Sequence, residues 1–222
     1  MASTDKDLGA KVADHLKGLG IETPIDEKFT KANLEANGGA YYTVKSNHAK
    51  PMMALRLDLE DDSLKDTPSR VAKMFCYEIF TGLDYDNFPK CSTFENKMNM
   101  DEMVAVKGAD VLSVCEHHFV AFIGKAHIAY IPGKKVLGLS KFHRVVDFFS
   151  RRPQVQERLT LQIYEALSYI LDTKDIAVVI EAEHLCVRLR GVKQDSTTIT
   201  SKMGGKFMDK PALREEFLAL TR

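Results

Sequence analysis

The chain has 222 residues, of which 45% are hydrophobic and 28% are charged, so it is long enough to bury a substantial core. Lysine plus arginine and aspartate plus glutamate both number 31, which excludes a general electrostatic attraction for nucleic acid or an anionic membrane. No apolar run approaches the ~20 residues that span a bilayer, and the N-terminus lacks the order of a signal peptide. We therefore expect a globular, cytoplasmic protein that holds any anionic ligand locally.

The first predicted element is a surface helix over residues 5–19, where apolar side chains recur at helical spacing. Gly20 follows as a stop signal. The apolar stripe consists of Leu8, Val12, Leu16 and Leu19.

Residues 22–56 have no clear periodicity, and Gly38 and Gly39 would break a long helix there. The pattern leaves the conformation of this stretch open, and we expect His48 to be an exposed loop residue. A second helix is predicted to start at Thr67, which can cap free amides and is followed by a proline, a residue tolerated in the first helical turn.

Short apolar runs separated by turns follow residue 100, and they predict an antiparallel sheet. Two amphipathic helices lie between these runs. The chain is therefore predicted to be α+β, with a helical N-terminal region over 1–100 and a catalytic domain over 101–222, whose sheet has helices on one face. The expected turns and helices are Gly124–Lys125, Pro132–Gly133, residues 140–150 and residues 155–171.

The motif CEHHF, residues 115–119, crowds a thiol, a carboxyl group and two imidazoles ahead of an apolar run. Thiolates and neutral imidazoles are preferred zinc ligands; structural sites use four of them, and catalytic sites use three and leave one position open. Only Cys186, in the sequence EHLC, has a comparable setting. Cys76 and Cys91 form no recognisable disulfide framework and are expected to be free thiols.

Local geometry narrows the ligand set. Residues three apart in a turn share a side, which joins Cys115 to His118, and residues two apart in a strand share a face, which joins His184 to Cys186. We predict Zn²⁺ held by Cys115, His118 and Cys186 with an open fourth position, and we expect His117 and His184 to act as acid and base.

The sequence GLSKFHR places a hydroxyl and two cations at the start of a helix. Ser140 at this position is explained equally well by helix capping. Lys141 in the first turn and Arg144 on the same face as Ser140 add charge to the exposed amides, and such a combination favours an anion.

Four motifs in fixed order, CEHHF, GLSKFHRVV, RRPQVQERLT and EHLCVRLRG, resemble those of GTP cyclohydrolase I. The resemblance runs from Asp61 to near the C-terminus and fits residues 22–56 less well. It implies the tunnel-type fold, in which subunits join their sheets into a barrel and pair into a homodecamer with shared active sites. It also implies zinc-dependent conversion of GTP to 7,8-dihydroneopterin triphosphate with release of formate, the first step of pterin and tetrahydrofolate biosynthesis.

The resemblance further implies residue roles. It assigns guanine to Glu157 with Gln156 beside it, although a carboxylate is also favoured at the helix start that Pro153 is expected to open. It places Arg70 and Lys73 near the substrate phosphates, where solvated charge is an equally good explanation. The residues that it assigns to the triphosphate are Ser140, Lys141, Arg144 and Arg190.

In the expected mechanism, zinc lowers the pKa of a bound water towards about 7 and provides the hydroxide that attacks C8 of guanine. His184 donates a proton to N7, and His117 and His184 shuttle protons while the new ring closes. We expect Glu116 only to orient a neighbouring side chain of the metal site.

Three alternatives stay open at this point. A closed structural zinc module of the same fold would use His184 as a fourth ligand and act only in protein binding. A zinc nucleobase deaminase would share Cys, His and Glu, but its HxE and PCxxC signature is absent. A nitrile reductase of the same superfamily would need a nucleophilic cysteine and a nicotinamide.

Overall fold

The computed structural model describes residues 3–26 and 39–221. By their contacts the residues form two compact units, Met1–Thr23 with Gly82–Arg222, and Pro24–Thr81. The helices are α1 (Lys6–Gly18), α3 (Gly39–Ala54), α4 (Thr67–Met74), α5 (Leu139–Ser150), α6 (Gln156–Leu171), α7 (Leu185–Arg188), α8 (Lys206–Asp209) and α9 (Pro211–Thr221). The strands are β1 (Thr93–Glu95), β2 (Val104–Cys115), β3 (Ala121–Tyr130), β4 (Lys135–Leu137), β5 (Pro153–Gln154), β6 (Ile176–His184) and β7 (Thr197–Met203).

The larger unit is built on a five-stranded sheet of order β5-β2-β3-β6-β7. All neighbours are antiparallel except β5, which pairs with β2 in parallel through two residues. A short second sheet pairs β1 with β4. The α+β prediction is confirmed, whereas the functional boundary at residue 100 stays a prediction.

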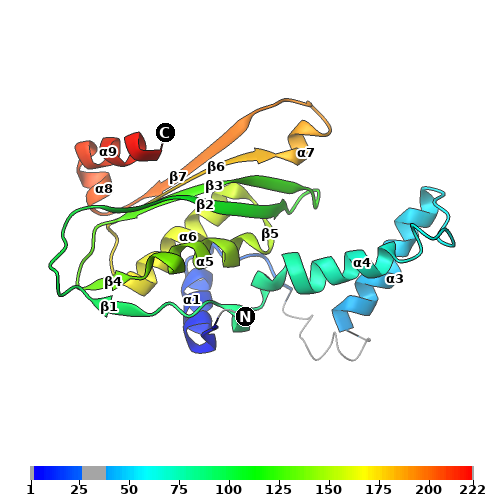
Figure 1. The fold of residues 1–222 in the computed structure, drawn as a ribbon, viewed down its shortest axis with the longest axis horizontal. Helices are drawn as coiled ribbons and strands as arrows, with labels where there is room; N and C mark the ends of the chain where they lie inside the picture. Colours follow the sequence, from blue (N-terminus) through cyan, green and yellow to red (C-terminus); the bar gives the residue numbers. More distant parts are fainter. Residues whose placement is uncertain (1–2, 27–38, 222) are drawn as a thin grey trace. The chain divides into compact units, whose positions relative to one another are not determined.

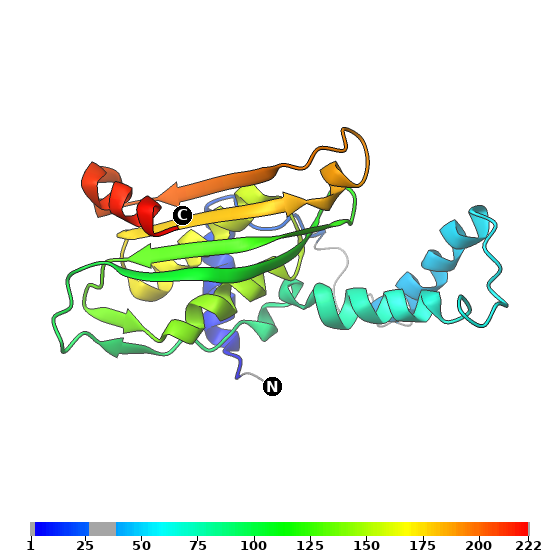
Figure 2. The same ribbon diagram turned by 45° about the horizontal axis from the view of Figure 1, so that its top comes forward.

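Successive side chains of the central strands point to opposite faces of the sheet, and each face carries its own hydrophobic core. In β6, Ile176, Val178 and Ile180 belong to the large core, while Ala177 and Val179 belong to the small one. Figures 1 and 2 show α5 and α6 against one face of the sheet, and α8 with α9 near one end of the other face. The helices of this unit thus cover one face along its length and the other at one end.

The turn predicted at Gly124–Lys125 is wrong, because both residues lie within β3. A Cβ on Gly124 would lie 2.0 Å from the carbonyl oxygen of Glu181, so the glycine permits close approach of β6. The chain reverses at residues 116–120 instead, between β2 and β3. The turn predicted at Pro132–Gly133 is confirmed, since these residues lie between β3 and β4.

The three predicted helices of this unit are present. In α1, the carboxylate of Asp5 accepts from the amide of Leu8, and Val12 and Leu16 are fully buried. Two details of the helix starts differ from expectation. Gly138, not Ser140, is the N-cap of α5, and Pro153 belongs to β5 rather than opening α6.

The smaller unit contains α3 and α4, with the π-helix Phe75–Ile79 continuing α4. The expectation of an exposed loop around His48 is wrong: α3 begins at Gly39, and His48 is half-buried within it. Gly38 lies outside the described residues. Asp66, not Thr67, is the N-cap of α4. Over the described residues, no helix in either unit combines the length and apolarity needed to cross a membrane.

Candidate metal centre and active site

The CEHHF motif forms the turn between β2 and β3, because β2 ends at Cys115 and Phe119 adopts a left-handed backbone with φ of 54°. The amides of His118 and Phe119 both donate to the carbonyl of Cys115, and the amide of Cys115 donates to Val120. These bonds close the loop on itself. We call residues 115–118 the metal turn.

The predicted ligand atoms of Cys115, His118 and Cys186 lie within 4.8 Å of one another. Cys115 Sγ is 3.9 Å from Nδ1 of His118 and 3.8 Å from Nδ1 of His117. Both thiols are buried while His118 is exposed, so the group is open on one side. Burial raises the pKa of the Cys186 thiol, and the neighbouring Cys115 raises it further.

Cys186 joins the ligand group, but the predicted strand face that it would share with His184 is wrong. β6 ends at His184, and Cys186 lies in the short helix α7 rather than on a strand face shared with His184. The helical turn carries the thiol toward Cys115. His184 belongs to no group of three close metal-ligating atoms among the residues that the structure describes.

His184 is held on two sides. Its ring stacks on Phe122 with a centroid separation of 4.7 Å and an interplanar angle of 11°. Its Nε2 lies 2.8 Å from Oε1 of Gln156. Burial lowers the pKa of His184, and the charge of Glu157 partly opposes this.

Gln156 occupies a different setting from that expected for a substrate contact. It is 1% exposed, and its amide nitrogen donates to the carbonyls of Ile180 and Thr198 at 3.0 Å each. Because the nitrogen faces these carbonyls, Oε1 must be the atom that faces His184, which therefore donates from Nε2. Glu157, the next residue in the first turn of α6, is exposed.

The predicted anion site lies at the far end of α5. The helix ends at Ser150, close to β5, which pairs with Cys115, whereas Ser140 lies ten residues earlier, about 15 Å along the helix axis. Lys141 and Arg144 are close enough to Cys91 to influence its thiol. The structure therefore does not bring Ser140, Lys141 and Arg144 to the metal turn of the same chain.

Arg190 lies at the metal turn, with Nη1 2.7 Å from Nε2 of His118. Arg188 instead pairs with Glu183 and, at 3.7 Å, with Asp195. In the smaller unit, Arg70 lies 3.6 Å from Asp66 and Lys73 is exposed.

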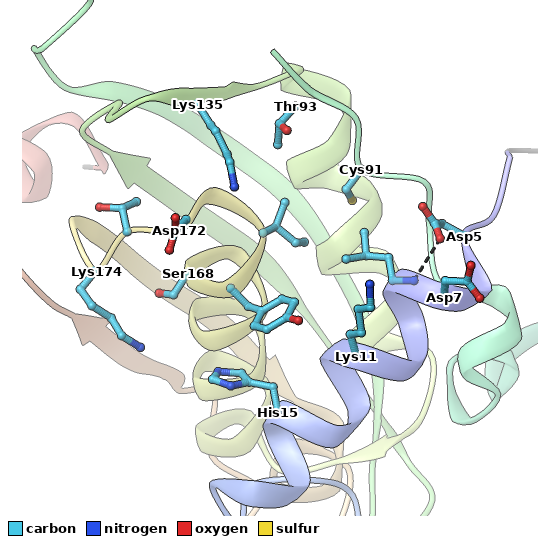
Figure 3. Close-up of a pocket in the computed structure, with 14 residues that line it drawn as sticks. Asp5, Asp7, Lys11, His15, Cys91, Thr93, Lys135, Ser168, Asp172 and Lys174 are labelled. Atoms are coloured by element: carbon cyan, nitrogen blue, oxygen red, sulfur yellow. Dashed lines mark hydrogen bonds between the residues drawn. The ribbon is translucent and has the colours of Figure 1, made fainter. Parts of the chain in front are cut away.

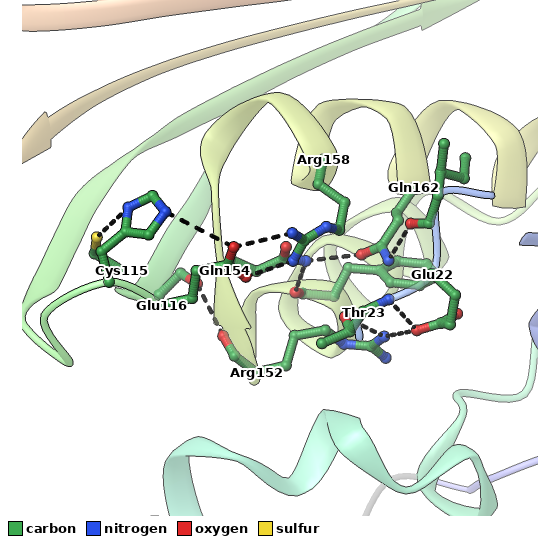
Figure 4. A network of polar contacts seen from close by, with 12 residues as sticks. Glu22, Thr23, Cys115, Glu116, Arg152, Gln154, Arg158 and Gln162 are labelled. Atoms are coloured by element: carbon green, nitrogen blue, oxygen red, sulfur yellow. Dashed lines mark hydrogen bonds and ion pairs between the residues drawn. The ribbon is translucent and has the colours of Figure 1, made fainter. Parts of the chain in front are cut away.

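Sequence reasoning missed a polar network beside the metal turn, drawn in Figure 4. Arg158 donates to both carboxylate oxygens of Glu116, at 2.6 and 3.0 Å. Further along, Gln154 donates to Gln162 at 2.7 Å, and buried Arg152 pairs with Glu22 at 2.8 Å. These partners are far apart in sequence, so no local pattern could have shown them.

A cavity of about 970 Å³ lies between α1, β1 and the C-terminal part of α6 (Figure 3). Its charged lining mixes both signs and includes Asp5, Asp7, Lys11, Lys135, Asp172 and Lys174. None of the predicted site residues lines it. The group of Cys115, His118 and Cys186, whose side chains are suited to bind a metal, is therefore the better candidate for the active site.

Comparisons with known proteins agree with the motifs. A sequence model of the family described as GTP cyclohydrolase I matches residues 44–222. The chain is 49% identical to GTP cyclohydrolase 1 of Edwardsiella ictaluri over 224 residues, covering 100% of this chain and 99% of that relative. It is 52% identical to GTP cyclohydrolase 1 of Aeromonas salmonicida, covering 91% of each chain. The structure of an apo archaeosine synthase QueF-Like aligns with a TM-score of 0.37 and 17% identity over 46% of this chain and 95% of that one, too weakly to carry an argument.

Proposed function

The chain belongs to the GTP cyclohydrolase I family and is a GTP cyclohydrolase, and we propose that it releases formate from GTP and yields 7,8-dihydroneopterin triphosphate. We further propose that Cys115, His118 and Cys186 hold a zinc ion that this reaction needs. The observation that carries the proposal is the convergence of two buried thiols and one exposed imidazole within 4.8 Å.

This donor set fits zinc, which prefers thiolate and imidazole ligands, and three protein ligands leave a position for water. When bound there, zinc would supply an activated water whose pKa such sites lower towards about 7. A ring that binds metal through Nδ1 carries its hydrogen on Nε2. The contact between His118 Nε2 and Arg190, itself a donor, would then be given up, which frees the guanidinium for a phosphate.

His184 is the residue proposed to donate a proton to N7 of guanine. Stacking on Phe122 and the hydrogen bond from Nε2 to Gln156 fix the plane of its ring. With Nε2 engaged, Nδ1 is the atom that takes and gives the proton. Gln156 therefore supports the reaction by orienting His184, which adds to the role in guanine binding suggested by resemblance.

Glu157 and His117 complete the groups proposed around the base. Glu157 is exposed at the start of α6, and a carboxylate can accept from N1 and from the 2-amino group of guanine together. His117 lies in the metal turn, 3.8 Å from Cys115 Sγ, and is proposed to move protons in the later ring closure.

We propose that the active site is shared between subunits of a homo-oligomer, a decamer by family resemblance. The support is geometric: Ser140, Lys141 and Arg144 lie at the end of α5 that points away from the metal turn. A triphosphate bound by these residues would therefore meet the zinc ligands of another chain, while Arg190 would come from the same chain as the metal.

Mixing inactive chains tests this arrangement. Cys115→Ala and Arg144→Ala chains, dissociated and reassembled together, should regain part of the activity. The matched control combines Cys115→Ala with Arg190→Ala, which lie at one end of one chain and should regain none. A fully active monomer would refute the shared site.

The function itself is tested by incubating purified protein with GTP. Release of formate and a pterin that becomes fluorescent after oxidation are expected. Release of ammonia without formate would indicate a deaminase. Oxidation of an added reduced nicotinamide would indicate a nitrile reductase, and bound zinc without any turnover would indicate a structural module. We also place the protein in the cytoplasm, because its four cysteines are free and metal thiolates persist in a reducing compartment.

A further inference from the structure

Glu116 and Arg158 form a two-armed ion pair beside the metal turn. Nη1 of Arg158 lies 2.6 Å from Oε2 of Glu116, and Nη2 lies 3.0 Å from Oε1. The two side chains are only 25% and 16% exposed. This fork geometry fixes both the distance between the groups and their relative orientation.

The pair joins the two segments that carry the chemistry. Glu116 stands between Cys115 and His117 in the metal turn, while Arg158 follows Glu157 in the first turn of α6. The carboxylate also faces His117, with 3.9 Å from Oε1 to Nε2 of that ring. Figure 4 shows Glu116 reaching across to Arg158 beneath the helix.

Besides this ion pair, Glu116 makes one other hydrogen bond to the segment that precedes α6. The amide of Glu116 donates to the carbonyl of Gln154 at 2.9 Å, in register with the pairing of Cys115 and Gln154. The two-armed bond from Arg158 adds a second point of attachment between the metal turn and the start of α6.

We propose that Glu116 and Arg158 are positioning residues that lock the metal turn against the start of α6, so that the zinc ligands and the guanine-binding carboxylate face one substrate together. The inference rests on the proposed function. Neither side chain is proposed to touch GTP. Their role is to hold Cys115, His117 and His118 at a fixed position relative to Glu157.

Magnitudes separate this role from a purely structural one. Replacing Arg158 with lysine leaves a cation facing Glu116, so no charge is left unpaired and the effect on stability should be small. By contrast, loss of a group that orients metal ligands costs about 10- to 100-fold in metal affinity or activity, and a misplacement of about 1 Å can cost 10² in rate. The proposal therefore requires an effect on the site that exceeds the effect on the fold.

The test compares Arg158→Lys, which keeps the charge but loses the fork, with Arg151→Lys. Arg151 serves as the control, because its Nε–H lies 2.8 and 2.9 Å from the two carboxylate oxygens of Asp147, in an ion pair that includes no residue of the metal turn. For each protein we would measure zinc affinity by chelator competition, the thermal midpoint, and kcat and KM for GTP at saturating zinc.

Arg158→Lys should weaken zinc binding and lower kcat, each by about 10- to 100-fold, with a thermal midpoint close to that of the unchanged protein. Arg151→Lys should change neither quantity. Glu116→Gln, which keeps the shape of the side chain, should repeat the losses. Zinc affinity and kcat within twofold of the original in both Arg158→Lys and Glu116→Gln, or equal losses in Arg151→Lys, would overturn the proposal.

The zinc measurement keeps the two hypotheses distinguishable. If the unchanged protein released no formate from GTP, the proposed function would fail, but the difference in zinc affinity between Arg158→Lys and Arg151→Lys would still decide whether the pair positions the metal turn.

Discussion

Two arginines six residues apart, Arg152 and Arg158, each pair with a distant carboxylate, and the contrast between them separates fold from site. Arg152 is fully buried and its partner Glu22 is 9% exposed, whereas Arg158 and Glu116 are 16% and 25% exposed. The same kind of ion pair thus occurs in two different environments. The neighbours of each pair indicate what it does.

Arg152 is surrounded by the core. Its guanidinium lies 4.9–5.2 Å from the ring centroids of Tyr85, Phe148 and Phe149, and it donates to the hydroxyl of Thr23 and the carbonyl of Gly82. Arg158 is instead surrounded by groups of the proposed reaction. We infer that the first pair specifies the packing of the larger unit and that the second orients its active site.

The largest expected effect is a loss of turnover on changing a residue of the proposed active site. His184→Ala should lower turnover by about 10² to 10⁴, because a general acid is removed, while zinc content and thermal midpoint stay near those of the unchanged protein. Formate release and elemental analysis measure both quantities. Loss of zinc from this variant would make His184 a ligand and favour the closed structural site.

At the core end, Arg152→Ala should destabilise the protein by about 3–5 kcal/mol, since it leaves the carboxylate of Glu22 buried without its cation. Denaturant unfolding measures the change. Replacing both partners, as Glu22→Leu with Arg152→Met, should cost less because no charge is left unpaired. The exposed Arg151→Ala should cost at most about 1 kcal/mol, and an equal loss there would erase the contrast.

Base recognition provides a smaller effect at the active-site end. Glu157→Ala should weaken GTP binding by about 1–3 kcal/mol, the cost of losing a charged hydrogen-bonding partner, and leave zinc in place. Glu165→Ala is a control on the same helix, because Glu165 pairs with His15 and Lys174 instead. Unchanged affinity in Glu157→Ala, measured by direct GTP binding, would reduce Glu157 to a helix-dipole carboxylate.

The smallest effect concerns the buried thiol of the core. Burial raises the pKa of Cys91 from 9.0 to about 11. Because the folded state binds the thiol proton more tightly than the unfolded state, this proton's contribution to stability is fully present below pH 9 and is lost as the pH rises toward 11. Stability should fall by about 2 kcal/mol across this window, and Cys91→Ala should flatten the fall. An identical slope in the variant would contradict the assignment.

The sequence predicted the elements whose signals are local. The thiols and imidazoles of CEHHF and of the Cys186 motif predicted a group of possible metal ligands, which the structure brings together. The apolar stripes predicted the helices α1, α5 and α6. Gly124 misled because a glycine demanded by the close approach of β6 looks like a turn glycine. In α3, Gly39 and the internal Pro51 concealed a helix of sixteen residues.

Long-range partnerships could not be predicted. Arg158 finds Glu116 across 42 residues, and Arg152 finds Glu22 across 130 residues. The resemblance places Gln156 beside the guanine, yet its buried amide donates to the carbonyl of Ile180 in β6 and to that of Thr198 in β7. Such contacts depend on tertiary packing, which no local pattern in the chain encodes.

The most direct test of the central claim is formate release from GTP by protein stripped of metal with a chelator and then titrated with zinc. The account predicts no turnover in the stripped protein, full recovery at about one zinc per chain, and no recovery in Cys115→Ala or Cys186→Ala at any zinc concentration in the titration. Full turnover by metal-free protein, or full recovery in either variant, would contradict it.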